Sequence, residues 1–356
     1  MRRSLELVGG MSALIRPGDR VLLKVNLLAP AGPDEAVTTH PAVVRAVTRL
    51  VLEAGGFPTI ADAPGFLFAG GKSRALRQSG IKAAADDMGV TAVQFESVEK
   101  PFVMTPVPDG VWLSQILAAR LALETDVIIT LPKLKTHSST WYTGAVKNMF
   151  GATATRTRKY AHNLGEHEKF AAAIVDIYSV LKPRLAVMDA VVGMEGEGPR
   201  HGNPRHAGLI MASRDSVALD AVAAGIIGFG PGEVLTVVNA AERGLGMGDT
   251  GCIEVVGERA ADVAVDFEKP SGRQVDIHPL LMRLGNRLVK VEPHLVRDAC
   301  TRCQICMKSC PADAIAMDPY PRIDRSLCIQ CFCCNEMCPE GAMEIRKNWL
   351  ARRLVR

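Results

Sequence analysis

Eight of the ten cysteines lie near the C-terminus in two copies of one spacing, and this repeat constrains the fold more than any other feature of the chain. The first copy reads C-x2-C-x2-C-x3-C and is followed by proline, and the second copy repeats it 28 residues later. A segment this short cannot build a large apolar core, so bound metal must replace part of that core. Because nothing in the sequence suggests secretion, spaced thiols indicate metal binding rather than disulfides.

The spacing is the one with which bacterial ferredoxins hold two [4Fe-4S] clusters. In that pattern three closely spaced thiolates hold one cluster, and the fourth, before proline, reaches across to the other cluster. A zinc ribbon needs only two C-x2-C pairs and has no use for a third thiolate at the same step. We therefore assign cluster one to Cys300, Cys303, Cys306 and Cys338, and cluster two to Cys328, Cys331, Cys334 and Cys310.

The other two cysteines are expected to play no part as ligands. Cys333 lies between two ligands of the second run and is expected to pack beside the cluster. Cys252 stands alone and is expected to be a buried small hydrophobe.

Composition places the chain among ordinary soluble globular proteins, because 48% of its 356 residues are hydrophobic and 22% are charged. The net charge of +4 is too small to indicate nucleic-acid binding. No apolar run is long enough for a transmembrane segment, and the N-terminal MRRSLELVGG lacks the apolar core of a signal peptide. Thiols and iron–sulfur clusters suit a reducing compartment, so we expect a cytoplasmic protein.

Residues 1–257 alternate apolar strand-like runs with helical patterns. Continuous Val, Ile and Leu runs between helices predict an α/β domain with a mainly parallel sheet and helices on both faces. The expected strands are 20–28, 57–61, 91–95, 124–133, 184–193 and 206–213, and the expected helices are 41–56, 73–79, 81–88, 166–181 and 216–227.

The C-terminal part divides into three further segments. Residues 258–298 are mixed and charged, and we expect a linker with a helix at 279–290. Residues 299–345 form the small α+β domain of the bacterial ferredoxin type, and 346–356 form a basic tail. The segment 65–73 partly matches a phosphate-binding loop, but its glycine spacing is wrong for one.

Polar side chains gather where the strands of the α/β domain are expected to end. In open parallel sheets ligands bind outside the carboxyl ends of the strands, so these residues predict a positive pocket. Such a pocket suits a carboxylate or phosphate, and a lysine or histidine there could deliver a proton. The catalytic candidates are Lys133, Lys135 and His137, and the substrate-binding candidates are Lys24, Asn26, Thr39, His40, Lys147, Asn148 and Glu195.

A second interpretation of the same residues is a single metal ion. His40 and His137 could join Asp62, Asp189 or Glu195 around it, although no H-x-H or H-E-x-x-H spacing supports such a site. The remaining histidines of this region are expected to be surface or capping residues, and they are His162, His167, His201 and His206.

The segments LLKVNL, AVTTHP, LPKLKTH, AVKNMFG and GMEGEGP, in this order, resemble the domain of unknown function 362 family. CIQCFCCNEMCPEGAM resembles the ferredoxin half that often follows that domain. The resemblance implies an iron–sulfur protein and covers about residues 5–345. Members commonly begin with a strand before the segment matching SLELVGG, so the resemblance implies that this strand is missing from the edge of the sheet here.

Three functions remain open from the sequence. The first is a ferredoxin-type oxidoreductase that passes electrons through two [4Fe-4S] clusters to an anionic small molecule. Its electrons would come from a redox partner protein such as a ferredoxin, a flavodoxin or a reductase. The second is a non-enzymatic electron-transfer or assembly adaptor. The third is a metal-dependent enzyme whose clusters are remote and structural.

Overall fold

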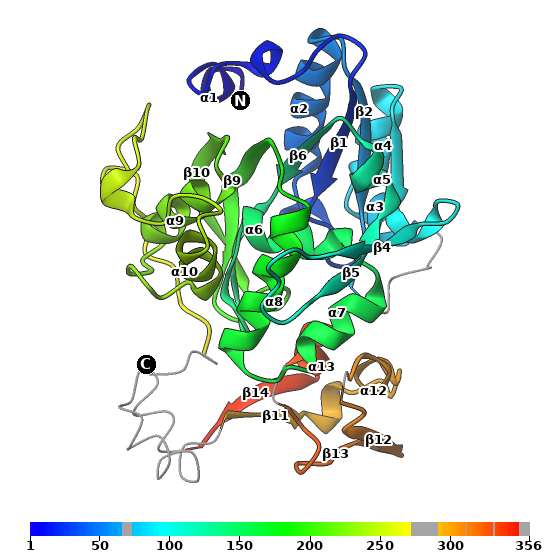
Figure 1. The fold of residues 1–356 in the computed structure, drawn as a ribbon. Coiled ribbons are helices and arrows are strands. Elements are labelled where there is room, and N and C mark those ends of the chain that lie inside the picture. The colour runs from blue at the N-terminus through cyan, green and yellow to red at the C-terminus, as the bar shows by residue number, and fades with distance from the viewer. Residues whose placement is uncertain (66–72, 272–290, 311, 330–331, 349–356) are drawn as a thin grey trace.

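The computed structural model describes residues 1–65, 73–271, 291–310, 312–329 and 332–348 (Figure 1). The helix expected at 279–290, the ligand candidate Cys331 and most of the basic tail lie outside these residues. In the described part, no helix combines the length and the apolar character that crossing a membrane requires.

The larger domain is built on an eight-stranded sheet, which is mainly parallel, as the Val, Ile and Leu runs predict, and contains two more strands than expected. The strand order is β3-β2-β1-β6-β9-β7-β8, and β10 pairs with β9. Neighbours from β3 to β9 run parallel, whereas β8 and β10 are antiparallel to their partners. The strands are β1 (Arg20–Val25), β2 (Phe57–Asp62), β3 (Thr91–Gln94), β6 (Val127–Leu131), β7 (Lys133–His137), β8 (Trp141–Thr143), β9 (Leu185–Glu195) and β10 (Asn203–Ser213).

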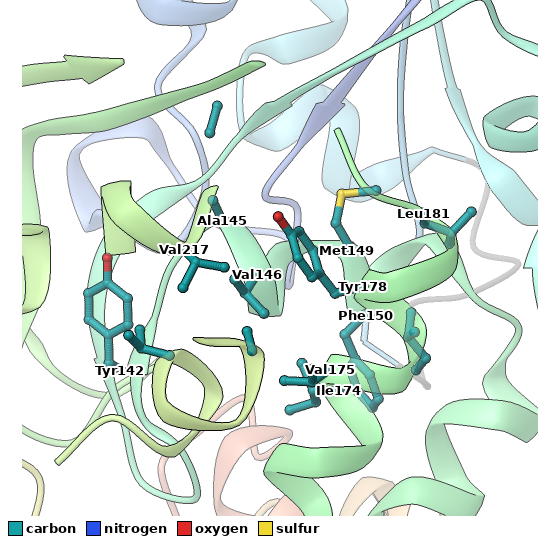
Figure 2. Packing of buried hydrophobic residues seen from close by; sticks show 14 of the residues in the cluster. Tyr142, Ala145, Val146, Met149, Phe150, Ile174, Val175, Tyr178, Leu181 and Val217 are labelled. Carbon is teal, nitrogen blue, oxygen red and sulfur yellow. The ribbon is translucent and has the colours of Figure 1, made fainter. Parts of the chain in front are cut away.

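Helices cover both faces of this sheet because neighbouring residues of its strands point to opposite sides. On β1, Leu22 belongs to one apolar core and Leu23 to the other. The first core includes residues of α6 (Ala145–Asn148), α7 (Thr155–His162), α8 (His167–Val180), α9 (Ser216–Ile226) and α10 (Leu235–Glu242), and part of it is drawn in Figure 2. The second includes residues of α1 (Arg2–Glu6), α2 (Pro41–Glu53), α3 (Arg74–Gln78) and α4 (Ile81–Asp87).

The structure also has elements that the sequence patterns do not predict. The polar segment after Pro132 is not a loop but the buried strand β7, which pairs with β9. A hairpin of β4 (Phe102–Pro106) and β5 (Gln115–Ala119) leads into the short helix α5 (Arg120–Glu124). Short 3-10 helices occur at Met11–Ala13, Pro33–Glu35, Phe95–Ser97, Met149–Ala152, Thr250–Cys252 and Arg297–Ala299.

The C-terminal module lies beyond α7 and α8 (Figure 1) and is built on two small antiparallel sheets. β11 (Val291–Leu295) pairs with β14 (Met343–Lys347), and β12 (Ile315–Asp318) pairs with β13 (Tyr320–Ile323). Its described helices are α12 (Ile305–Ser309) and α13 (Cys333–Glu336). The module thus takes its first strand from the segment that the sequence suggests as a linker.

The 28-residue repeat in the sequence is also a repeat in backbone conformation. Gln304, just before α12, has φ 62°, and Phe332, just before α13, has φ 56°. Asp313 and Gly341, again 28 positions apart, have φ 50° and 62°. The left-handed backbone conformation is uncommon outside glycine. Its recurrence at matching positions shows that the two halves share the same local backbone conformation.

Hydrogen bonds to sulfur repeat in the same way. The backbone N–H of Ala314 donates to Sγ of Cys310 at 3.2 Å, and that of Ala342 donates to Sγ of Cys338 at 3.1 Å. These two cysteines are the ones that precede proline in each run. In both halves, therefore, the sulfur of the fourth cysteine accepts a hydrogen bond from the backbone N–H four residues later.

Candidate functional site

A cavity of about 90 Å³ lies between the α/β domain and the C-terminal module, and we call it the inter-module cavity. The α/β domain contributes the ends of β1 and β2 and residues of β7, α6 and α7, while the module contributes Cys333 and Met337. Its lining comprises Lys24, Asn26, Leu27, Leu28, Asp62, Ala63, Gly65, Lys135, His137, Thr143, Lys147, Asn148, Phe150, Gly151, Arg158, His162, Pro199, Cys333 and Met337.

The cavity brings together some of the residues that the sequence suggests for substrate binding and catalysis. Those that line it are Lys24, Asn26, Lys135, His137, Lys147 and Asn148. Four other candidates do not line it, and they are Thr39, His40, Lys133 and Glu195. A cavity thus lies where the carboxyl ends of the parallel strands predict a ligand site, although only some of the candidate residues line it.

Lys24 forms a buried ion pair with Asp62 on the neighbouring strand, with Nζ and Oδ1 2.7 Å apart. Its ammonium also donates to the carbonyl of Val25 at 2.8 Å and to Oδ1 of Asn148 at 3.2 Å. Burial lowers the pKa of Lys24 and raises the pKa of Asp62, and the charge of each partner opposes these shifts. One positive charge of the strand ends is therefore already balanced inside the protein.

The close approach to this pair requires glycine at position 151. A Cβ atom there would lie 2.4 Å from Oδ1 of Asp62 and 3.1 Å from Nζ of Lys24. The KNMFG segment can therefore pass over the Lys24–Asp62 pair only because residue 151 has no side chain.

Lys133 forms the second buried pair, with Nζ 2.9 Å from Oδ2 of Asp189. The same carboxylate oxygen accepts the backbone N–H of His40 at 2.8 Å. Thr39 donates its hydroxyl to the carbonyl of Leu131 at 2.6 Å and accepts the N–H of Asn26 at 2.8 Å. These contacts tie the Thr39–His40 loop to the central strands.

Lys135 and His137 lie on β7 beside the cavity. The ammonium of Lys135 donates to the carbonyls of Val37 at 2.8 Å and Pro199 at 3.4 Å. Nδ1 of His137 accepts the N–H groups of Ser139 at 3.0 Å and Thr140 at 3.3 Å, so the proton of the neutral ring is on Nε2. Burial, together with the positive charges of Lys147 and Lys135, lowers the pKa of His137 well below its usual value.

Helix α6 presents Lys147 and Asn148 to the cavity and is held by a buried carboxylate. Asp220 accepts the first N–H groups of this helix, from Ala145 at 2.7 Å and from Val146 at 2.9 Å. Burial raises the pKa of Asp220 to about 7. The amide of Asn148 donates to the carbonyl of Lys24 at 3.1 Å and so fixes α6 against β1.

Arg158 and His162 on α7 are cavity residues that the sequence patterns did not reveal. The guanidinium of Arg158 pairs with Glu96 at 3.2 Å and donates to the carbonyl of Pro64 at 3.0 Å. The expectation of a surface or capping role for His162 is wrong, because its side chain is buried. Their spacing could have indicated burial, because Thr157, Arg158, Ala161 and His162 lie on one face of α7. Most of these residues are polar, so this face does not look like a buried one in the sequence.

The other polar candidates lie elsewhere. Oε2 of Glu195 accepts the N–H of Glu268 at 3.1 Å. Nδ1 of His167 lies 2.5 Å from the carbonyl oxygen of Ser139, and His206 is exposed on β10. The expectation of a buried Cys252 is wrong, because this residue is exposed.

The single-ion interpretation finds no ligand set among the residues that the structure describes. In these residues no three His, Cys, Asp or Glu side chains are placed to hold one metal ion. Nδ1 of His40 accepts the N–H of Ala42 at 3.2 Å and caps α2, while Nδ1 of His137 accepts backbone amides. Each histidine therefore uses one ring nitrogen for local structure.

The cysteines of the C-terminal module fit a multi-iron cluster. Cys300, Cys303, Cys306 and Cys338 line a single cavity, although Cys338 is far from the other three in sequence. Thiols spread around a space suit a cubane, which is wider than one ion. Of the cluster-two candidates, Cys310, Cys328 and Cys334 pack in one apolar group with Cys306 and Cys338.

Comparisons with known proteins agree with this architecture. Residues 293–316 match the family model described as "4Fe-4S binding domain", so the chain is an iron–sulfur protein that joins an α/β domain to a ferredoxin-type module. Residues 21–225, more than half of the chain, match the model described as "Domain of unknown function (DUF362)". The chain belongs to this family, as the sequence motifs indicate.

One curated relative is the thylakoid-associated protein sll1697 of Synechocystis sp., which is 34% identical over 253 residues that cover 70% of this chain and 75% of that protein. Among solved structures, the lactate racemase apoprotein of Thermoanaerobacterium thermosaccharolyticum has a TM-score of 0.40 at 12% identity, covering 60% of this chain. A structural-genomics target from Thermotoga maritima has a TM-score of 0.38 at 16% identity, covering 56% of this chain. The chain spans about half (51%) of each of these two structures.

Proposed function

We propose that the chain is an oxidoreductase that passes electrons from its iron–sulfur module to a small anion bound in the inter-module cavity. One observation carries this proposal: the cavity is lined by lysine and histidine residues of the α/β domain and by Cys333 and Met337 of the module. Cys333 is the direct neighbour of Cys334, a cluster-two candidate. A guest in this cavity would lie beside the segment that carries that ligand.

We propose that the module holds two [4Fe-4S] clusters, with the ligands expected from the sequence. The two equivalent half-sites, each with a left-handed residue before its helix and an N–H donor to its fourth thiol, support this number. When bound, such clusters supply single electrons at low potential. Two of them could supply both electrons of a two-electron reduction.

The charge of the lining favours an anionic guest. Among the described residues that line the cavity, Lys24, Lys135, Lys147 and Arg158 are basic, whereas Asp62 is acidic. A water molecule occupies about 30 Å³ in the liquid, so a cavity of about 90 Å³ suits a guest of only a few heavy atoms. We therefore propose a small carboxylate or a similarly small oxyanion as the substrate class.

Within this cavity we assign charge binding to Lys147 and Arg158. His137 is neutral and has its proton on Nε2, so it can donate a hydrogen bond to an oxygen that becomes negative during reduction. Lys135 and Asn26 complete the polar wall. For Lys133, Thr39, His40 and Glu195 we propose indirect roles, since their contacts hold the loops around the cavity.

The adaptor function is the competing proposal, and the cavity beside Lys135 is the observation that counts against it. An adaptor would need a docking surface but no polar cavity next to a cluster-two ligand. Electrons would come from an external one-electron carrier such as a ferredoxin, a flavodoxin or a reductase. The reduced thiols suit the cytoplasm as the location.

The proposal is tested by reoxidation of the reduced holoprotein without oxygen. Protein reduced with dithionite and freed of excess reductant is mixed with pyruvate, acrylate or nitrite, and cluster absorbance is followed. We expect at least one of these anions to reoxidise the wild type, and Lys147→Gln and His137→Asn to slow this at least about tenfold. Lys182→Gln, at an exposed lysine after α8, is the matched control and should react like the wild type.

Two outcomes would contradict the proposal. One is that none of the three anions reoxidises the protein faster than buffer does. The other is that Lys147→Gln and His137→Asn react at the wild-type rate, which would remove the cavity from the reaction.

A further inference from the structure

His162 and Cys333 form a direct contact between the α/β domain and the iron–sulfur module. Nδ1 of His162 lies 3.5 Å from Sγ of Cys333, and both side chains are buried and line the inter-module cavity. The imidazole ring packs against two phenylalanines, which also contact each other with their centroids 5.6 Å apart. Its centroid lies 5.6 Å from that of Phe150 and 4.3 Å from that of Phe170.

This contact is a hydrogen bond to an uncharged imidazole. Burial lowers the pKa of His162 to about 3, and the positive charges of Lys147 and Arg158 add to the effect. The imidazole is therefore uncharged near neutral pH, and its Nδ1 can accept the S–H of Cys333. A sulfur donor at 3.5 Å is within the normal range for such a bond.

Further contacts hold the same short helix of the module. Nε2 of His201 lies 2.8 Å from the carbonyl oxygen of Asn335 in α13. Met337, just after α13, packs closely on Gly65. A Cβ atom on residue 65 would lie 2.8 Å from Sδ and from Cε of Met337. Helix α13, which carries Cys334, is thus fixed against the wall of the cavity from several directions.

Both candidate clusters have a ligand next to the wall of the inter-module cavity. The second cysteine run contributes Cys333, the neighbour of the cluster-two candidate Cys334, and Met337, the neighbour of the cluster-one candidate Cys338. An anion bound in the cavity would therefore lie beside the segment that carries these two ligands.

We propose that His162 is a positioning residue that couples the cavity to the iron–sulfur module through Cys333, so that an anion in the cavity lowers the reduction potential of a cluster in the module. The sign follows from charge, because reduction adds an electron beside an existing negative charge. The inference deepens the proposed function and rests on it in one respect, namely that the cavity binds an anion.

Linkage makes the coupling reciprocal: an anion that disfavours reduction is itself released by reduction. For a one-electron couple, a tenfold weaker affinity for the reduced state corresponds to a 59 mV lower potential. An anion would therefore bind more tightly to the oxidised protein than to the reduced protein.

The test is a potentiometric titration of the holoprotein followed by electron paramagnetic resonance. Acetate and formate serve as probes because neither is reduced under these conditions, and chloride at equal ionic strength is the reference. In the wild type we expect acetate or formate to lower one of the two cluster potentials. His162→Phe keeps the aromatic packing but removes the acceptor, and should lose most of this shift.

If His162→Phe does not fold, other variants of His162 and Cys333 test the same contact. His162→Gln and Cys333→Ser retain an acceptor and a donor, so both should keep the shift. Cys333→Ala removes the donor and should lose it. His206→Phe, at an exposed histidine on β10, is the matched control and should behave like the wild type.

The inference is overturned if neither probe shifts a potential, or if His162→Phe and Cys333→Ala keep the wild-type shift. Because the probes are not reduced, these outcomes do not depend on turnover. A shift without any reoxidation by pyruvate, acrylate or nitrite would reject the proposed function and leave the inference in place.

Discussion

At the scale of single residues, the buried lysines decide what the strand ends can bind. Lys24 and Lys133 lie among the central strands with less than 2% of their side chains exposed, and each is paired with a carboxylate on a neighbouring strand. They therefore stabilise the sheet more than they attract an anion. Two further basic residues, Lys147 and Arg158, line the cavity from helices, and Arg158 is itself paired with Glu96.

We predict that Asp62→Leu strongly destabilises the protein, because it leaves Lys24 buried without its counter-charge. Breaking a buried pair from one side costs about 3–5 kcal/mol. The double variant Lys24→Met, Asp62→Leu should recover most of this loss, since it removes both charges. The measurement is the free energy of unfolding from urea titrations.

The matched control for this prediction is the exposed pair of Arg20 and Asp126, 3.1 Å apart. Asp126→Asn should cost no more than about 1 kcal/mol, as expected for a surface pair. Equal losses for Asp62→Leu and Asp126→Asn would show that the buried pair has no special role.

A second prediction concerns the pH dependence that Asp220 gives to stability. Its pKa is about 7 in the folded protein against an ordinary value of 3.8, so the folded state binds its proton more tightly than the unfolded state. The stability contributed by this proton is present below about pH 4 and is lost as the pH rises to about 7. Asp220→Asn should remove this part of the pH slope.

The measurement is the urea midpoint of the wild type and of Asp220→Asn across this pH range. The wild-type midpoint should fall relative to that of the variant as the pH rises. Parallel curves would mean that Asp220 does not titrate in this range.

At the scale of elements, the apolar strands and the helices between them could be predicted because their own residues show which parts are buried and where each helix begins. β1, β6 and β9 have continuous Val, Ile and Leu runs, and α2 begins with proline after a capping histidine. β7 could not be predicted in this way. Its KLKTH sequence looks like a loop, and it is buried because Asp189 and the carbonyls of Val37 and Pro199 accept from its lysines.

The candidate site was likewise predictable only in part. Lys24 and Asn26 follow from the rule on strand ends because they lie at the end of β1, and Lys135 and His137 follow from it because they come soon after β6. Arg158, His162 and Cys333 were not predicted as site residues. The sequence of α7 places Arg158 and His162 on one helix face, but the contact of His162 with Cys333 at the start of α13 depends on how the two domains pack.

Helix α12 offers a prediction at the element scale, because it begins after a residue in the left-handed conformation. Gln304 is exposed and has φ 62°, a conformation that costs a non-glycine residue about 1 kcal/mol. Gln304→Gly should therefore stabilise the loaded module by about that amount. The measurement is the guanidinium concentration at which the cluster absorbance is lost.

Gln304→Ala is the control, since alanine keeps the Cβ atom and should give no gain. Phe332, at the equivalent position before α13, is buried, so Phe332→Gly also removes apolar contacts and should not stabilise the module. A loss of stability in Gln304→Gly would show that the side chain of Gln304 matters more than its backbone strain.

At the scale of the whole molecule, the two domains differ in what holds them together. The α/β domain has two extensive apolar cores on the faces of its sheet. Half of the buried residues in the described core of the module are cysteines, and the others are Ala314, Ile315, Ala342 and Met343. Bound metal must therefore supply much of the module's stability, while the α/β domain can stand without it.

We predict that removing iron by anaerobic chelation unfolds the C-terminal module and leaves the α/β domain folded. Hydrogen exchange followed by mass spectrometry should show loss of protection across 291–348, while β1, β6 and β9 stay protected. Because Cys333 and Met337 leave the wall of the inter-module cavity in this state, α7 around His162 should also exchange faster. Thiol labelling provides an internal reference, since the exposed Cys252 should react equally in both forms. Protection retained across the module after full iron loss would show that its fold does not depend on the metal. Loss of protection throughout the chain would show that the two domains unfold as one unit, coupled through the contacts around His162 and Cys333.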